Sequence, residues 1–282
     1  MAKIICNFIS YSLRRTVDIT VVVPTPTIPD AGRMARGEGE CRHTPKAPYP
    51  VLYLLHGMGN NHATWNGYTN VELYAEERQI VVVCPSGENK GYIPNGADDF
   101  FRFISEELPD FICGIFPVSK RPEDTYLAGL SMGGYGALVH GLSHPERFAA
   151  VGAFSAGGAI PSPEWIAKPD QLRQAVQDGS ILHQKDGVPV KYDAFALKAA
   201  ADYLESPARA NPKFYLACGD ADSVYERATK YRDFLRSVGA DVTWDGMQGL
   251  GHEWRFWDAE VEKFLDWIPR TDPYAKEGRR RV

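Results

Sequence analysis

The sequence has few cysteines and no long apolar run, and each absence excludes a class of protein. The five cysteines are odd in number and scattered along 282 residues, without a Cys-x-x-Cys pair. A disulfide framework or a zinc site therefore has little support, and reduced thiols in a cytoplasm fit better. No apolar stretch is long enough to cross a bilayer, and the N-terminal residues carry no cleavage site typical of a secretion signal. We expect a cytoplasmic protein without a membrane partner.

Clusters of basic charge are also scarce. The formal net charge is −5 at pH 7, and the one basic cluster, Arg279 to Arg281, stands at the extreme C-terminus. No basic run coincides with aromatic residues, so we expect no nucleic-acid partner. The cluster is more typical of a solvated and flexible tail, which we place over residues 271–282.

The sequence does contain a regular alternation of apolar and amphipathic segments. Hydrophobic residues make up 44 % and charged residues 24 %, as is ordinary for a globular protein. Short apolar runs alternating with helical patterns predict one domain over residues 1–282, built on a mostly parallel sheet with helices on both faces. Strands are expected over residues 17–23, 51–55, 80–84, 125–128, 148–154, 213–218 and 241–244. Helices are expected over residues 100–111, 135–142 and 254–268.

Two segments interrupt this alternation. Residues 24–50 are rich in proline, glycine and charge, which favours an exposed loop, with a functional lid as the alternative. Residues 157–207 are polar and helical, and they are too long for a simple connection. We interpret them as an insertion over one edge of the sheet.

The strongest chemical signal is Gly-Leu-Ser-Met-Gly at residues 129–133. An expected strand enters this motif and an expected helix leaves it, which is the context that a nucleophile elbow needs. A serine at such a turn has a strained backbone, and the glycines on both sides keep neighbouring chains from colliding. We predict that Ser131 is a nucleophile. The alternative is a glycine-rich turn without chemistry.

A serine hydroxyl needs a neighbouring base, and His252 is the best candidate. It follows the last expected strand, in a glycine-rich loop just before the final helix, where such a fold carries its base. A surface histidine at a helix N-terminus is the alternative interpretation. His56 is a rival base, but a histidine directly after a buried strand more often shapes the loop. His140 and His144 belong to the helix after the elbow.

The acid that orients the histidine is expected in the loop after the strand at residues 213–218. Asp220 and Asp222 both lie there. The spacing from Gly219 favours Asp222, whereas Asp220 is better placed to cap the turn. The acid would hold the tautomer of His252 and stabilise the imidazolium without accepting its proton.

An oxyanion hole needs two backbone N–H groups that converge beside the nucleophile. We assign one to Met132, directly after Ser131, and the other to Met58, in the glycine-rich loop after the strand at residues 51–55. Aromatic residues elsewhere are candidates for a substrate pocket, with packing in the core as the alternative. They are Trp65, Tyr68, Tyr92 and Trp165, of which we favour Trp65 and Tyr68.

Together these motifs resemble the esterase D-like, feruloyl and acetyl esterase branch of the α/β-hydrolases, and most closely its small bacterial tributyrin esterases. The similar stretches, spread over most of the chain in the expected order, lie at residues 53–59, 64–65, 68–70, 103–108, 128–136 and 251–254. The resemblance implies an α/β-hydrolase fold and a serine carboxylesterase that cleaves short acyl esters through an acyl-enzyme, without metal or cofactor. It also favours Asp222 as the acid and Met58 as an oxyanion donor.

The chain departs from this branch in three places. Residues 24–50 are longer than the usual connection, and residues 159–206 match no motif. S-formylglutathione hydrolases of the superfamily carry a cysteine near the oxyanion strand, where this chain has residues 58–61, Met-Gly-Asn-Asn. A thioesterase of that kind therefore ranks low.

Two further functions compete with ester hydrolysis. One is an acyltransferase that uses the same three residues, and the other is a non-catalytic binding protein that kept the fold. The presence of Ser131, Asp222 and His252 together with both glycine-rich loops argues against the second, since binding alone needs none of them in combination. The sequence also leaves a homo-oligomer open.

Overall fold

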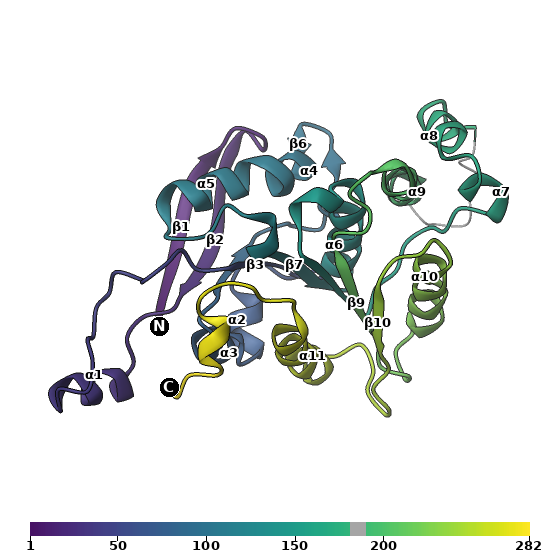
Figure 1. The fold of residues 1–282 in the computed structure, drawn as a ribbon. Coiled ribbons are helices and arrows are strands. Elements are labelled where there is room, and N and C mark those ends of the chain that lie inside the picture. Colours follow the sequence, from purple (N-terminus) through teal and green to yellow (C-terminus); the bar gives the residue numbers. More distant parts are fainter. Residues whose placement is uncertain (181–189) are drawn as a thin grey trace.

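The computed structural model describes residues 1–180 and 190–282 (Figure 1). Among them, eight strands form one sheet in the order β1-β2-β4-β3-β7-β8-β9-β10. Their bounds are Ala2–Ser10, Arg15–Val23, Val81–Pro85, Val51–Leu55, Thr125–Leu130, Ala150–Phe154, Lys213–Ala217 and Val242–Asp245, in that spatial order. β1, β2 and β4 pair antiparallel, and every pair from β4 to β10 is parallel. A separate hairpin joins β5 (Pro94–Asn95) to β6 (Asp98–Asp99).

The central strands are buried on both faces, as their continuous apolar runs predict. In β3 the side chains of Val51, Tyr53 and Leu55 belong to one hydrophobic cluster, and those of Leu52 and Leu54 belong to another. Successive side chains of a strand point to opposite faces, so the two clusters lie on the two sides of the sheet. This confirms the predicted mostly parallel sheet with helices on both faces.

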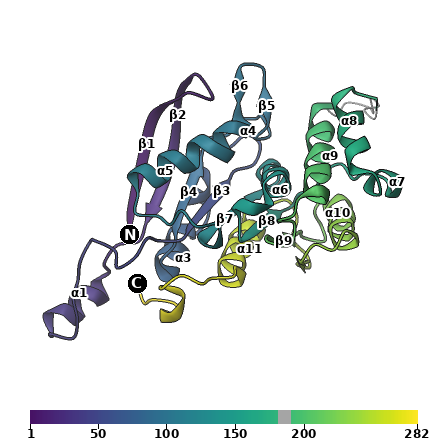
Figure 2. The same ribbon diagram turned by 45° about the horizontal axis from the view of Figure 1, so that its top comes forward.

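The helices that flank the central strands form two layers (Figures 1 and 2). Below the sheet in Figure 1 lie α2, α3 and α11, and above it lie α4, α5 and α6. The lower helices span Thr64–Tyr68, Val71–Arg78 and Trp254–Trp267, and the upper ones span Phe100–Arg102, Leu108–Ile115 and Met132–Ser143. A π-helical turn, Phe103–Glu107, joins α4 to α5. Pro109 is the second residue of α5, and its ring nitrogen has no N–H to donate.

The strand β1 was not expected from the sequence. Most of its side chains are exposed or only half-buried, as in Ile5 and Ile9, because β1 is the edge of the sheet. Such a strand lacks the alternation of apolar and polar residues by which a half-buried strand is recognised. Buried Glu107 fixes the β1–β2 turn to the upper layer, since its carboxylate accepts hydrogen bonds from Ser10 Oγ and from the backbone N–H of Ser12.

The two segments that interrupt the alternation both contain helices. Within residues 24–50, α1 spans Ile28–Ala35 and begins with a capping box between Thr27 and Asp30. That pattern is present in the sequence and marks a helix start, so the expectation of a loop throughout was wrong there. In the expected insertion, α7 (Pro163–Ile166), α8 (Pro169–Gln177) and α9 (Val190–Glu205) follow β8, and residues 181–189 lie outside the described part.

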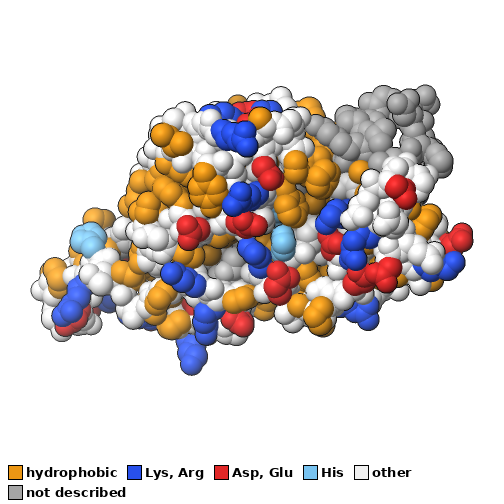
Figure 3. Space-filling view, turned by 90° about the horizontal axis from the view of Figure 1, so that it is seen from above, with side chains coloured by type: hydrophobic (Ala, Val, Ile, Leu, Met, Phe, Trp, Pro, Cys, Tyr) orange, Lys and Arg blue, Asp and Glu red, His pale blue; other side chains and the backbone are white. Residues whose placement is uncertain are grey.

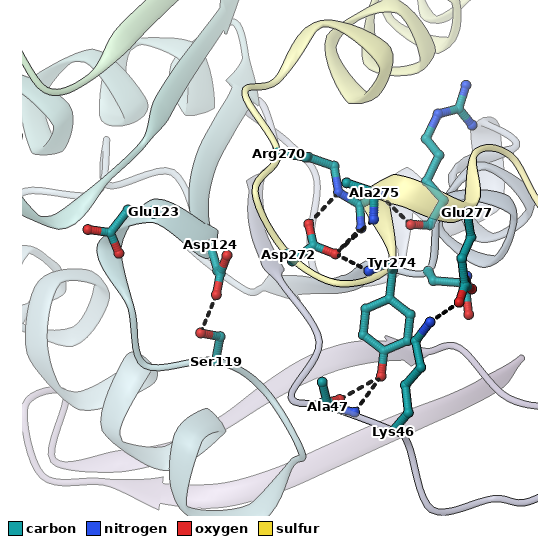
Figure 4. A network of polar contacts seen from close by, with 12 residues as sticks. Lys46, Ala47, Ser119, Glu123, Asp124, Arg270, Asp272, Tyr274, Ala275 and Glu277 are labelled. Atoms are coloured by element: carbon teal, nitrogen blue, oxygen red, sulfur yellow. Dashed lines mark hydrogen bonds and ion pairs between the residues drawn. The ribbon is translucent and has the colours of Figure 1, made fainter.

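The C-terminal residues contact the segment that carries α1 (Figure 4). The hydroxyl of Tyr274 donates to the Ala47 carbonyl oxygen at 2.6 Å, and Lys46 forms an ion pair with Glu277. Buried Asp272 accepts hydrogen bonds from Arg270 and from the Tyr274 N–H. The flexibility of residues 271–282 stays a prediction, but their start is packed rather than solvated.

The basic cluster at the end of the chain was expected to be solvated, but the side chain of Arg280 is largely buried. Its guanidinium contacts the buried carboxylate of Glu76, and its backbone N–H donates to the Glu77 carbonyl oxygen at 2.7 Å. Elsewhere on the surface, acidic and basic side chains are interspersed across the face seen in Figure 3. No helix in the described residues combines the length and the apolar character needed to span a bilayer.

Candidate active site

Ser131 occupies a strained turn between β7 and α6. Its φ of 51° and ψ of −117° lie in a region that residues other than glycine rarely adopt. The backbone holds this conformation through a hydrogen bond from the Ser131 N–H to the Phe154 carbonyl oxygen, at 2.8 Å. A Cβ atom on Gly129 would lie 2.4 Å from the Gly133 carbonyl carbon, and one on Gly133 would lie 2.4 Å from the Leu55 carbonyl oxygen. The glycines of the motif are therefore required by close backbone contacts.

The structure brings Ser131, Asp222 and His252 into one hydrogen-bonded chain. The distance from Ser131 Oγ to His252 Nε2 is 3.0 Å, and His252 Nδ1 lies 2.9 Å from Asp222 Oδ2. The three residues follow β7, β9 and β10, and the carboxyl ends of parallel strands meet at one edge of the sheet. With Nδ1–H donating to the carboxylate, Nε2 is free to accept the serine proton. This arrangement can generate an activated serine nucleophile.

The environment of Asp222 keeps its carboxylate ionised. Its side chain is fully buried, and burial on its own raises the pKa. The Val224 N–H donates to Oδ1 at 2.9 Å, and Ser155 and His252 add further hydrogen bonds, so that the pKa is held below its usual value. A buried anion beside His252 can stabilise the imidazolium that forms when the histidine accepts a proton.

The competing acid, Asp220, has a different position. It is exposed, and its Oδ1 accepts a hydrogen bond from the Gly249 N–H at 2.7 Å. Asp220 therefore ties its own loop to the loop that carries His252. Of the two carboxylates that the sequence left open, Asp222 is the one that contacts the imidazole.

The other candidate histidines, His56 and His140, are buried and form hydrogen bonds with backbone groups. His56 Nε2 accepts from the Gly87 N–H at 2.8 Å, and its Nδ1 donates to the Gly57 carbonyl oxygen at 2.7 Å. Burial lowers the pKa of His56 to about 4 and that of His140 to about 3. His140 Nε2 donates to a backbone carbonyl within the upper layer, that of Tyr92. Neither imidazole is available as a base, and His56 shapes its loop.

The loop after β3 lies directly beside the serine. A Cβ atom on Gly57 would be 2.4 Å from Leu130 Cδ1, so that the leucine side chain would have to move, and it would be in contact with the Ser131 Cβ at 3.5 Å. Gly59 has a φ of 79°, which lets the chain curl back. Met58 between them and Met132 at the start of α6 line the same cavity as Ser131. Their role as oxyanion donors stays a prediction.

Ser131 and His252 open into a cavity of about 610 Å³. Much of its wall consists of small residues that follow β8, from Ala156 to Ala159, and of the rings of Tyr135 and Trp257. The wall is mainly apolar, which suits an acyl group or an apolar leaving group. In sequence most of these wall residues fall at the start of the expected insertion over residues 157–207, and the two consecutive glycines were their only local signal.

The predicted aromatic pocket residues lie elsewhere, and that prediction was wrong. Trp65 is completely buried, and its Nε1–H donates to the Leu55 carbonyl oxygen at 3.0 Å. Tyr68 is exposed and stacks on Trp254, with ring centroids 5.0 Å apart. Tyr92 is buried beneath His56, and its hydroxyl donates to the His56 carbonyl oxygen. Trp165 packs against the α8–α9 cluster. None of the four is among the described residues that line the cavity.

Two residues that the sequence analysis missed support the histidine and the acid. Ser155, at the end of β8, has a φ of 51°, and its Oγ accepts a hydrogen bond from Trp257 Nε1–H at 3.0 Å. The Trp257 ring in turn contacts the imidazole of His252. Ser155 lies in no recognised motif, and Trp257 looks like one more apolar residue of α11. In residues 1–180 and 190–282 no group of three or more His, Cys, Asp or Glu side chains could hold a metal ion.

Comparison with known proteins places this chain among esterases. A family model described as putative esterase matches residues 41–237. An acetyl esterase of Caldicellulosiruptor saccharolyticus is 28 % identical over 278 residues, which cover 96 % of this chain and 99 % of that protein.

Solved structures show the same fold. A fluorophosphonate-binding serine hydrolase of Staphylococcus aureus superposes with a TM-score of 0.72 at 23 % identity, covering 96 % of this chain and 99 % of the other. An S-formylglutathione hydrolase of the same organism gives 0.70 at 24 % identity, covering 95 % and 98 %. A ferulic acid esterase gives 0.69 at 21 % identity, covering 95 % and 97 %. At these identities the likeness establishes the shared α/β-hydrolase fold.

Proposed function

The chain belongs to the putative esterase family and is a serine ester hydrolase, and we propose that Ser131, His252 and Asp222 form its catalytic triad. The observation that carries this proposal is the continuous chain of hydrogen bonds from Ser131 Oγ through the imidazole to the buried carboxylate. The strained turn at Ser131 supports it, because backbone strain of this kind concentrates at functional sites.

The reaction has two stages, acylation of Ser131 and hydrolysis of the acyl-enzyme. His252 Nε2 accepts the proton of Ser131 Oγ as this oxygen attacks the ester carbonyl, and collapse of the tetrahedral intermediate releases the alcohol with that proton. The acyl group is left on Ser131. Water then attacks the acyl-enzyme and gives one proton to His252. Collapse of the second tetrahedral intermediate releases the carboxylic acid, and His252 passes that proton to Ser131 Oγ. Asp222 stays ionised throughout and stabilises the imidazolium.

The oxyanion of each tetrahedral intermediate needs donors that are already in position. We assign this task to the backbone N–H groups of Met58 and Met132. The close approach of Gly57 to Ser131 supports the first assignment, and the position of Met132 as first residue of α6 supports the second. Removal of one such donor typically costs about 10² to 10³ in turnover.

The proposed substrates are esters of short acyl groups, from acetyl to butyryl. The mainly apolar wall of small residues supports an aliphatic acyl group. One relative is an acetyl esterase and one structural neighbour a ferulic acid esterase, so acetyl or feruloyl groups on plant polysaccharide are natural candidates. We propose that the enzyme acts in the cytoplasm on small-molecule or carbohydrate esters, without cofactor, metal or nucleic acid.

A second candidate is a thioesterase that resembles S-formylglutathione hydrolases. Two structural neighbours carry that name, which favours it. The loop after β3 lacks the cysteine of that group and has Met58, Gly59, Asn60 and Asn61 instead. An acyltransferase with the same triad differs only in the acceptor, and added alcohols in the assay distinguish it.

The experiment that tests the proposal is hydrolysis of p-nitrophenyl esters from acetate to dodecanoate, together with methyl ferulate, by the wild type and by Ser131→Ala. We expect Ser131-dependent turnover that falls steeply beyond butyrate. Folded protein that turns over no ester, or a Ser131→Ala variant as active as the wild type, would contradict the proposal.

A further inference from the structure

Arg227 brings a positive charge to the wall of the Ser131 cavity. It is the third residue of α10, Tyr225–Ser237, which follows the loop that carries Asp222. Its side chain lies against Gly157, where an added Cβ atom would be 3.0 Å from Arg227 Cγ. Gly157 belongs to the run of small residues that forms the same wall. The absence of a side chain at Gly157 therefore lets the arginine stem lie along the cavity.

Arg227 differs from the other basic residues of its helix. Lys230 pairs with Glu226 at 2.6 Å, Arg232 pairs with Asp233 at 2.8 Å, and Arg236 donates to the Val242 carbonyl oxygen. In the described part of the chain, no carboxylate forms an ion pair with the exposed guanidinium of Arg227. Glu226, its immediate neighbour in sequence, is engaged by Lys230 instead.

The position of Arg227 is also electrostatically unfavourable. The N-terminus of a helix carries a partial positive charge, so a cation in the first turn is disfavoured. Asp193, the acidic residue among the described lining, stands in the first turn of α9, where the helix dipole favours a carboxylate. Helix electrostatics thus account for Asp193 but not for Arg227.

We propose that Arg227 binds a carboxylate of the substrate, so that the preferred substrates are esters that carry an acidic group. This inference rests on the proposed function, because Arg227 and the candidate nucleophile share one cavity. A guanidinium presents two parallel N–H donors that match a carboxylate. The acidic group belongs to either the acyl half or the alcohol half of the ester. Pairs of anionic and neutral substrates that differ in only one half distinguish these two possibilities.

The test compares an anionic with a neutral ester in each half. For the alcohol half the pair is 4-acetoxybenzoate and its methyl ester; for the acyl half it is the 4-nitrophenyl hemiester of glutaric acid and 4-nitrophenyl pentanoate. The quantity is the ratio of kcat/KM for the anionic ester to that for the neutral one. In at least one pair, Arg227→Gln should lower this ratio about tenfold, the effect expected for loss of one charge-assisted hydrogen-bonded pair.

Further variants test whether the effect depends on charge within the Ser131 cavity. Arg227→Glu should lower the ratio more than Arg227→Gln does. Arg227→Lys keeps the positive charge, so its ratio should lie between those of Arg227→Gln and the wild type. Asp193→Asn should raise the ratio, because it removes a like charge from the cavity. Lys230→Gln is the matched control, since Lys230 lies one turn further along α10 and does not line the Ser131 cavity. It should leave the ratio within about twofold, the scale of an exposed ion pair.

An unchanged ratio in Arg227→Gln for both pairs, with Ser131-dependent turnover of the neutral esters, would overturn the role of Arg227 and leave the proposed function standing. An equal fall of the ratio in Lys230→Gln would overturn it too, since only general surface charge would then act. No Ser131-dependent turnover of any ester would overturn both proposals.

Discussion

The indole of Trp257 stands perpendicular to the imidazole of His252, with ring centroids 4.9 Å apart. Trp257 is buried, and its own orientation is fixed because its N–H donates to Ser155 Oγ at 3.0 Å. The edge-to-face contact limits how far the imidazole can tilt. We therefore predict that Trp257 is a positioning residue, which acts through His252 on the proposed triad.

Trp257→Phe should lower kcat about tenfold with little change in KM. Phenylalanine fills most of the space but lacks the N–H that fixes the ring, so the imidazole loses its rigid neighbour. Steady-state kinetics on a p-nitrophenyl ester measure the effect. Trp267→Phe is the control, because Trp267 also loses a side-chain hydrogen bond, to Thr243 Oγ1 at 3.0 Å, without lining the cavity. Equal losses in the two variants would show a general effect on stability.

Asp222→Asn should lower kcat by roughly 10³ to 10⁴-fold, since an amide favours the wrong tautomer of His252. Asp220→Asn should cost less than about tenfold, because its amide oxygen can still accept from the Gly249 N–H. Turnover of a short-chain ester by the two variants, with circular dichroism to confirm folding, decides between the carboxylates. Larger loss in Asp220→Asn would reverse the assignment.

Acid should destabilise the protein through His56 and His140. The unfolded chain binds a proton at each histidine near pH 6.5, whereas burial lowers the folded pKa values to about 4 and about 3. The unfolded state therefore binds more protons between these limits, and the free energy of unfolding falls as pH drops below 6.5. Each histidine contributes about 1.4 kcal/mol per pH unit in that window.

Urea unfolding of the wild type and of His140→Gln at pH 7, 6 and 5 measures this effect. Glutamine can still donate to the Tyr92 carbonyl oxygen but does not titrate. The variant should therefore lose less stability between pH 7 and pH 5 than the wild type does. The same slope in both proteins would mean that His140 does not contribute to acid unfolding.

Gly133→Ala should destabilise the fold by several kcal/mol, because its Cβ would lie 2.4 Å from the Leu55 carbonyl oxygen and the backbone of β3 cannot move freely. Gly114→Ala is the control. Gly114 lies within α5, where an added Cβ meets nothing within 4 Å, so the substitution should stabilise by about 0.5 to 1 kcal/mol. Thermal unfolding measures both, and a Gly133→Ala variant as stable as the wild type would contradict the argument.

The sequence by itself determined the features that depend on near neighbours in the chain. The continuous apolar run of β3 specifies a strand buried on both faces, and the glycines beside Ser131 specify its strained turn. The chain order of serine, acid and histidine specifies which loops meet, because parallel strands end at one edge of the sheet. Even the missed helix α1 had a local signal, in the capping box at Thr27.

Only the tertiary structure decided which side chains share one environment. His252 and Ser131 are 121 positions apart, and the choice of Asp222 over Asp220 depends on which carboxylate reaches the imidazole. Trp65 was misplaced because an indole suits a core and a pocket equally well by composition. Arg227 looks like any other basic residue of an amphipathic helix. Which distant groups a side chain contacts depends on how separate segments pack together, and the local sequence does not specify it.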